Sequence, residues 1–215
     1  MLFHDRLNAA ARLVEKLSAY RGKNPLVLAI PRGAVLMAKR IADELGGEVD
    51  VVLVRKIGAP YNPEFAIGAV DESGNFFVTQ DAVLIGANED YIEQEKQKQL
   101  EIMRQRRAQY TPLREPIDPT GRIVIVVDDG LATGSTMIAA LRALKQSNPA
   151  KLICAVPVAP PDTLGKVGLY ADEVVCVHAT HDFFAVGQFY ANFPQVSDEE
   201  VVAILLESAG TNKPA

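Results

Sequence analysis

The sequence VIVVDDGLATGSTM, residues 124–137, combines several features that point to one fold class. It belongs to a run of apolar β-branched residues from Ile123 to Val127, which is typical of a parallel strand covered on both faces. Two carboxylates, Asp128 and Asp129, follow the run, and apolar residues recur at helical spacing from Met137 onward. The stretch therefore predicts a strand, a turn and the start of a helix, which is where open α/β sheets bind ligands.

The turn between this strand and this helix has the composition of a phosphate-binding site. Its sequence is ATGST, residues 132–136, so the helix would begin among three hydroxyl groups and free backbone N–H groups, at the positive end of its dipole. Successive strand residues point to opposite faces, so Asp128 and Asp129 can converge only beyond the strand. Two carboxylates there could accept hydrogen bonds from the hydroxyls of a sugar phosphate, bind a metal, or act as acid and base. A helix cap alone needs only one such residue.

Strands and helices alternate on both sides of this stretch. The pattern before it predicts a strand at 25–30, a helix at 34–45 and a strand at 50–54, and the pattern after it a strand at 151–158, a helix at 160–167 and a strand at 173–177. Asp5 and Ser197 are the predicted caps of a first helix, residues 6–20, and of a last one. The fold class is therefore α/β, with a central, mostly parallel sheet and helices on both faces.

Residues 57–120 interrupt this alternation. Two short strands, 66–70 and 76–79, flank the turn Glu72-Ser73-Gly74-Asn75 and predict a hairpin. Residues 88–109 are highly charged, with acids first and arginines in the last turns, as the helix dipole favours. We therefore expect a lid or arm with an exposed helix, which could also serve as the contact of a homodimer.

Length and composition set limits on the protein class. The 215 residues suit one domain, residues 1–209, with a disordered tail at 210–215. A net charge of −5 gives no indication of nucleic-acid binding. Cys154 and Cys176 lie in apolar surroundings and are expected to be buried thiols. There is no signal core and no apolar run long enough to span a membrane, so we expect a cytoplasmic protein with no membrane partner.

The segment VVDDGLATGSTM resembles the 5-phosphoribosyl-1-pyrophosphate (PRPP) motif of type I phosphoribosyltransferases, in which an apolar strand, two acids and A-T-G-x-T follow one another. The resemblance implies a type I phosphoribosyltransferase-like fold with a lid insertion and a small C-terminal hood. It also implies that Asp128 and Asp129 bind the ribose hydroxyls. The implied 5-phosphate site comprises Ala132, Thr133, Gly134, Ser135 and Thr136.

Two further segments extend the resemblance. AIPRGAVL, residues 29–36, stands where the family has its pyrophosphate-contacting loop, which often contains a strained peptide, and implies contacts from Arg32 and Gly33. VRKIGAP, residues 54–60, is similar to the Arg-Lys-x-Gly segment of adenine-type members, and implies pyrophosphate contacts from Lys56 and, as second choice, Arg55. Arg32 and Lys56 would be the catalytic residues. The implied cofactor is Mg²⁺, carried mainly by ligand oxygens, with Asp128 and Asp129 as the candidate protein ligands.

The acceptor is less clear from the sequence. In 6-oxopurine members the residue before the Thr-Gly of the motif is an acid, whereas here it is Ala132, which argues against that class by the usual mechanism. The hood would be residues 178–196, where Phe183 or Phe184 could stack on a planar base, although these aromatics could equally belong to the core. The segment HDFFAVGQFYANF resembles a group of bacterial phosphoribosyltransferases of unassigned acceptor.

The resemblance implies Mg²⁺-dependent transfer of a 5-phosphoribosyl group from PRPP to a small nitrogenous acceptor, a nucleobase in the first place, with release of pyrophosphate. The partners would be PRPP and that acceptor. The alternative is a non-catalytic sensor of PRPP or a nucleotide on the same fold, because a fold and a ligand site do not guarantee turnover. A metal-dependent hydrolase would require a second acidic cluster, which the sequence does not contain.

Overall fold

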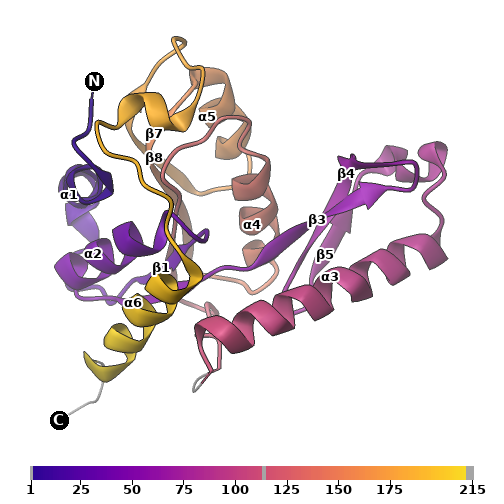
Figure 1. Ribbon diagram of the computed structural model, residues 1–215, viewed down its shortest axis with the longest axis horizontal. Helices are drawn as coiled ribbons and strands as arrows, with labels where there is room; N and C mark the ends of the chain where they lie inside the picture. Colours follow the sequence, from indigo (N-terminus) through magenta and orange to yellow (C-terminus); the bar gives the residue numbers. More distant parts are fainter. Residues whose placement is uncertain (1, 113–114, 212–215) are drawn as a thin grey trace.

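The core of the protein is a five-stranded parallel sheet. The computed structural model describes residues 2–112 and 115–211. The strands are β1 (Leu26–Ala29), β2 (Glu48–Val51), β6 (Ile123–Val127), β7 (Lys151–Ala159) and β8 (Glu173–Ala179), and their order across the sheet is β2-β1-β6-β7-β8. All four pairings are parallel. The predicted α/β class and parallel core are therefore confirmed (Figure 1).

The sheet is buried because its apolar side chains alternate between two hydrophobic cores. On one face Val27, Ala29, Ile125 and Val127 belong to one cluster, which α1 (Arg6–Lys16) and α2 (Val35–Leu45) cover. On the other face Leu28, Val124, Val126 and Leu152 pack under α4 (Ser135–Lys145) and α5 (Pro161–Gly168). This alternation explains why the strands have continuous apolar sequences, and it confirms helices on both faces (Figure 1).

The order of the strands determines where a ligand can bind. From β1 the chain moves to β2 on one side, and it later returns through β6 on the other side of β1. Connections that leave in opposite directions open a crevice at the carboxyl ends of the two neighbouring strands, here β1 and β6. The loop after β1 and the turn after β6 therefore face the same crevice.

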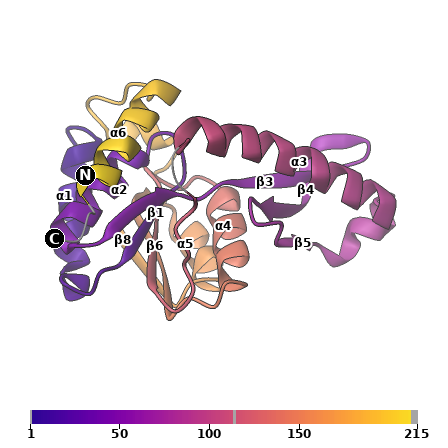
Figure 2. The same cartoon turned by 90° about the horizontal axis from the view of Figure 1, so that it is seen from below.

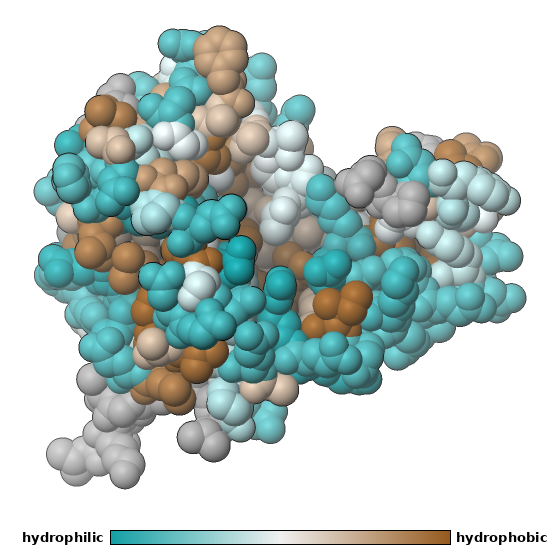
Figure 3. Space-filling view, viewed as in Figure 1, coloured by the Kyte–Doolittle hydropathy of each residue, from teal (hydrophilic) through white to brown (hydrophobic). Residues whose placement is uncertain are grey.

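An arm projects from this core between β2 and β6 (Figures 1 and 2). Its antiparallel sheet comprises β3 (Val54–Ala59), β4 (Asn62–Asp71) and β5 (Phe76–Val78), and a short 3₁₀ turn, η2 (Gln80–Ile85), leads to the long helix α3 (Glu89–Tyr110). At the outer end of the arm, Tyr61 is 93% exposed and Leu84 is 84% exposed. The molecule is hollowed between the core and this arm (Figure 3).

The arm contains the main difference from the predicted elements. The hairpin and the long helix, capped by Asn88, are confirmed. The strand predicted at 50–54 is instead two strands, because β2 ends at Val51 and β3 begins at Val54 in the other sheet. Arg55 and Lys56 are consequently part of the arm rather than a loop at the end of a core strand.

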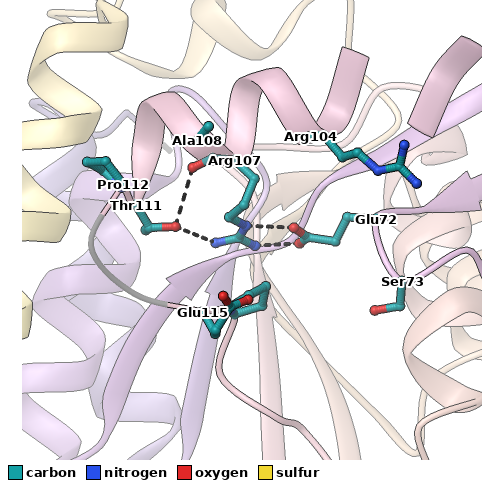
Figure 4. Close-up of a pocket in the computed structure, with 9 residues that line it drawn as sticks. Glu72, Ser73, Arg104, Arg107, Ala108, Thr111, Pro112 and Glu115 are labelled. Carbon is teal, nitrogen blue, oxygen red and sulfur yellow. Dashed lines mark hydrogen bonds and ion pairs between the residues drawn. The ribbon is translucent and has the colours of Figure 1, made fainter. Parts of the chain in front are cut away.

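The base of the arm is fixed by one arginine of α3. The Arg107 guanidinium donates to both carboxylate oxygens of Glu72 at the hairpin turn, to Asp50 Oδ1 at 2.8 Å, to the Val51 carbonyl at 2.9 Å and to Thr111 Oγ1 at 3.4 Å. Figure 4 shows the pair with Glu72 at the edge of an open groove of about 600 Å³. Because Asp50 and Val51 belong to β2, this cluster joins the arm to the core sheet.

The ends of the chain agree in part with the predicted elements. Asp5 caps α1 by accepting from the Asn8 backbone N–H, but the helix ends at Lys16 and a 3₁₀ turn follows. Helix α6 (Asp198–Thr211) packs on α2 and α3, so two residues of the predicted tail are helical, and residues 212–215 lie outside the described residues.

Strand β7 continues through Pro157, and its register passes from Val156 to Val158. No helix within the described ranges is both long and apolar enough to cross a membrane.

Candidate active site

The turn after β6 exposes hydroxyl groups at the start of a helix. Helix α4 begins at Ser135, and Gly134 before it has a φ of 73°, a conformation that glycine adopts without strain. Thr133, Ser135 and Thr136 are all exposed, and the hydroxyls of Thr133 and Ser135 lie 3.0 Å apart. The first N–H groups of the helix therefore share one surface with these side chains, as a phosphate site requires.

Helix α5 supports this turn from behind. The Thr163 hydroxyl donates to the Ala132 carbonyl at 2.8 Å. A Cβ at Gly134 would lie 2.9 Å from the Thr163 methyl group, so the glycine also permits close packing. Thr163 follows the motif by about thirty residues, and no local pattern in the sequence identifies it as a support of the turn.

Asp129 is held by a buried ion pair. Its Oδ2 accepts from Arg6 Nε at 3.0 Å and from Arg6 Nη2 at 2.9 Å, and the two side chains are 16% and 9% exposed. Arg6 also donates to the Pro194 carbonyl at 2.7 Å and lies 3.8 Å from the centre of the Phe193 ring. The structure therefore fixes Asp129 through helix α1. Arg6 is separated from it by more than a hundred residues, so this partner could not be inferred from the sequence.

Asp128 lies in a different environment. Its Oδ1 accepts from the Asp129 backbone N–H at 2.9 Å. Burial, and next the charge of Asp129, raise the pKa of the Asp128 carboxyl well above its usual value. Burial also raises the pKa of Asp129, although Arg6 opposes this effect. A cation or a set of hydroxyl donors would stabilise two carboxylates in this situation.

These two acids are compatible with Mg²⁺, because it prefers oxygen ligands and commonly takes one or two protein carboxylates, with the rest from water and phosphates. No group of three His, Cys, Asp or Glu residues within the described residues could hold a metal by itself. Asp128 and Asp129 would therefore share the ion with the oxygens of a bound ligand.

The loop after β1 approaches the acids from the neighbouring strand. The Pro31–Arg32 peptide is cis. A Cβ at Gly33 would lie 2.2 Å from Asp129 Oδ2 and 2.9 Å from Arg6 Nη2, so only glycine fits against this ion pair. The Arg32 side chain is 42% exposed and lies 3.8 Å from Asp198 at the start of α6. The structure thus brings Arg32 and Gly33 to the crevice that the acid pair faces.

The two basic residues of β3 occupy different positions. Arg55 donates to Gln99 Oε1 of α3 and lines a cavity with Pro31 and Thr136. Lys56 is exposed and lines a groove between β3 and α3, further along the arm. Of the two predicted pyrophosphate contacts, Arg55 therefore lies next to the phosphate turn and the loop after β1, whereas this structure does not bring Lys56 to them.

The predicted hood is largely a packed aromatic cluster. Phe183 lies 5.3 Å from Phe189, Tyr190 stacks on Phe193 at 4.7 Å, and the Tyr190 hydroxyl donates to the Asp129 carbonyl at 2.7 Å. Phe184, in contrast, is 88% exposed. The segment therefore supports the acid pair from behind, which accounts for most of its aromatic residues as core. Phe184 alone has an exposed ring.

A parallel sheet of this order, with an acid pair and a hydroxyl-rich helix start at its switch point, defines the class of α/β proteins that bind phosphorylated sugars or nucleotides. The chain belongs to the family described as the phosphoribosyl transferase domain, whose model matches residues 3–193. The resemblance to type I phosphoribosyltransferases is thereby confirmed.

Individual relatives agree with this assignment. The chain is 42% identical over 208 residues to two proteins of Mycobacterium tuberculosis named "Putative phosphoribosyl transferase", MT0597 of strain CDC 1551 and Rv0571c of strain H37Rv. The match covers 95% of this chain but 46% of each relative, so the chain spans about half the length of the curated relatives it matches. The crystal structure of TT1426 from Thermus thermophilus is similar over 96% of this chain and 99% of its own, with 45% identity and a TM-score of 0.88.

Proposed function

We propose that the protein transfers the 5-phosphoribosyl group of PRPP to a nitrogen nucleophile and releases pyrophosphate. The main support is one juxtaposition: the exposed hydroxyls of Thr133, Ser135 and Thr136 lie at the start of helix α4, next to the half-buried pair Asp128 and Asp129. Helix N-termini bind phosphate, and buried carboxylates accept hydrogen bonds from ribose hydroxyls. PRPP contains both a 5-phosphate and free ribose hydroxyls, so one molecule could occupy both parts of the site.

The reaction forms a bond from the acceptor nitrogen to C1 of the ribose and breaks the bond from C1 to the pyrophosphate oxygen. Negative charge develops on the leaving pyrophosphate, and the guanidinium groups of Arg32 and Arg55 would stabilise it. This role is supported by the position of Arg55 beside Pro31 and Thr136 and by that of Arg32 directly after Pro31. Lys56 would join these arginines only if the arm moved. The carboxylates would face the positive charge that develops on the ribosyl group. Mg²⁺, when bound, would neutralise part of the pyrophosphate charge, with Asp128 and Asp129 as its protein ligands.

The acceptor would be a planar nitrogenous compound. It would not be a 6-oxopurine that reacts by the usual mechanism, because that mechanism uses a carboxylate of the motif. Ala132 is exposed at the position where such members have an acid, so the turn offers a methyl group there. Phe184 is the exposed aromatic ring of the hood on which a base could stack.

The experiment that tests this proposal combines binding and turnover. PRPP affinity is measured by calorimetry with Mg²⁺, and pyrophosphate release is assayed with a panel of purine and pyrimidine bases and small amines. Asp128→Asn should weaken PRPP binding by about ten- to a hundred-fold, the range for a hydrogen bond to a charged group. Asp90→Asn, at an exposed site in the first turn of α3, is the matched control and should bind like the wild type.

The outcomes separate the proposal from its alternative. Pyrophosphate release with at least one acceptor supports the transferase. Tight PRPP binding without release for any acceptor favours a non-catalytic sensor. Unchanged PRPP binding by Asp128→Asn contradicts the assignment of this acid to the ribose site.

A further inference from the structure

We infer that Arg106, on the arm helix α3, is a further binding residue for the pyrophosphate group of PRPP. The inference rests on the proposed function, because it assigns a ligand group to one wall of the same site. Arg106 lies in a charged segment that would ordinarily be a solvated helix face. In the fold, however, Arg106 lines a cavity together with residues of the core sheet and its loops.

A small cavity places Arg106 beside both loops of the site. The cavity has a volume of about 70 Å³ and lies between the core sheet and α3. Pro31 of the loop after β1 and Thr136 of the phosphate turn line it from the core, and Arg55 and Arg106 line it from the arm. In the proposed site the 5-phosphate binds at the turn that contains Thr136 and the ribose at Asp128 and Asp129, and the loop after β1, which packs against Asp129 at Gly33, would receive the pyrophosphate. Arg55 and Arg106 line the cavity beside that loop.

The neighbouring residue explains why Arg106 is held there. Adjacent residues of a helix point about 100° apart, so Arg106 and Arg107 face different directions. Arg107 is 11% exposed and enters the cluster with Asp50 and Glu72, which fixes the last turns of α3 against β2. Arg106 is exposed, lies 5.9 Å from the centre of the Tyr110 ring and lines the cavity. The buried arginine thus positions the exposed one.

The charges around this cavity favour an anion with several negative charges. Arg55 and Arg106 line it from two different elements, among residues that are otherwise apolar apart from Thr136, and within the described residues neither arginine forms an ion pair. Arg32 follows Pro31, which also lines the cavity, and its side chain lies 3.8 Å from Asp198. The protein as a whole carries a net charge of −5, so this concentration of arginines is a local feature. Guanidinium groups bind phosphate oxygens in a bidentate geometry, which suits a diphosphate.

The test compares ligands that share or lack the pyrophosphate group. Binding of PRPP, inorganic pyrophosphate and ribose 5-phosphate is measured by calorimetry for the wild type, Arg106→Gln and Arg106→Lys. Arg106→Gln should weaken PRPP and pyrophosphate binding by about ten- to a hundred-fold and leave ribose 5-phosphate within about two-fold. Arg106→Lys should recover part of the lost affinity, because lysine retains the positive charge but cannot donate two parallel hydrogen bonds as a guanidinium does.

The matched control is Arg104→Gln, two residues earlier on the same helix. Arg104 is 65% exposed, lies 3.6 Å from Glu101, and lines the groove beside Glu72 and Ser73 (Figure 4) instead of the cavity that Arg106 lines. It should bind all three ligands like the wild type.

Each outcome decides the inference. Equal loss for ribose 5-phosphate, or no loss for PRPP and pyrophosphate, overturns it. If the wild type binds pyrophosphate but not PRPP, the proposed function fails, while loss of pyrophosphate binding in Arg106→Gln still supports the role of Arg106. If the wild type binds neither ligand, both proposals are overturned.

Discussion

Asp128 is a residue whose environment disfavours its own charge. Burial and the carboxylate of Asp129 raise its pKa above the usual value of 3.8, so the folded protein binds this proton more tightly than the unfolded chain does. A raised pKa means that the stability associated with this group is present at low pH and is lost as the pH rises from the unfolded value through the folded one. Above the unfolded pKa value, this carboxyl group therefore makes the ligand-free protein less stable than it is at lower pH.

We accordingly expect Asp128→Asn to increase the free energy of unfolding of the ligand-free protein at neutral pH, while it weakens PRPP binding. The asparagine oxygen can still accept the hydrogen bond from the Asp129 N–H. Urea denaturation over a pH series would show the difference from the wild type growing as the pH rises above about 4. A variant that is less stable than the wild type at neutral pH would refute this account of the site.

At this scale the sequence identified the residues of the turn but not their partners. Residues 132–136 and the acid pair are adjacent in the chain, so their spacing and chemistry were enough to predict a phosphate and ribose site. Arg6, Thr163 and Tyr190 contact that site from α1, α5 and the hood. Each comes from a segment whose local sequence has only ordinary helix or core character. Their roles arise from the tertiary packing, which a single sequence does not reveal.

Among the elements, helix α3 depends most on one side chain. Arg107→Met would remove the guanidinium that contacts Asp50, which is 1% exposed, and Glu72, which is 15% exposed. Removing one partner of a buried ion pair costs about 3–5 kcal/mol. We expect a decrease of this size in the free energy of unfolding, and faster amide hydrogen exchange in α3 and β3.

A second substitution separates the charge effect from packing. Glu72→Gln added to Arg107→Met removes the carboxylate charge that paired with Arg107 and should recover part of the stability. Arg104→Met, at an exposed site of the same helix, should change the free energy of unfolding by less than about 0.5 kcal/mol. Full stability of Arg107→Met would show that the cluster does not anchor the arm.

The elements were predicted well where their pattern was local. The hairpin turn, the cap of α1 at Asp5 and the parallel crossover all have short sequence signatures, and the structure contains them. The third strand of the arm, β3, was not predicted, because its sequence contains Gly58 and continues directly from the core strand. The predicted end of a core strand at Arg55 and Lys56 was wrong for the same reason: nothing in the apolar run marks the change of sheet after Val51.

For the molecule as a whole, Tyr110 and Asp198 join its distant parts. Tyr110 ends the arm helix, and its hydroxyl donates to Asp198 at the start of α6, which in turn lies next to Arg32 of the loop after β1. Burial, and next the hydrogen bond to Asp198, raise the pKa of Tyr110 to about 12. Below pH 10 the neutral phenol contributes its full stabilisation, which is lost as the pH rises from 10 towards 12.

Tyr110→Phe should therefore lower the free energy of unfolding by about 1 kcal/mol at neutral pH, the usual value of one hydrogen bond. The difference between the variant and the wild type should shrink between pH 10 and about 12, when the wild type loses the same contribution. Chemical denaturation at alkaline pH measures this directly. Because the variant retains the other tyrosines, their ionisation cancels in the comparison, and a constant difference across this range would contradict the predicted link.

The fold class and the insertion between β2 and β6 could be predicted at the scale of the whole chain, because both depend on the order of the elements. The sugar-phosphate site stays a prediction that rests on one long motif. The direction in which the arm leaves the core, and the contacts that α6 makes with α2 and α3, could not be predicted. Both depend on tertiary contacts of buried charged residues, such as those of Arg107 with β2 and with the hairpin turn. The position of Arg106 could not be predicted either, because it follows from the position of Arg107.

The anchoring of α3 at one end also has a mechanical consequence. With 22 residues, the helix is about 33 Å long, so a rotation of about 5° at its base would displace the far end by about 3 Å. The fulcrum is Arg107, and Arg106 is the adjacent residue, so the same rotation hardly moves Arg106. The arm is in this sense a lever with the proposed pyrophosphate contact at its stationary end. The exposed side chains of Tyr61 and Leu84, near the other end of the arm, would move furthest in such a rotation.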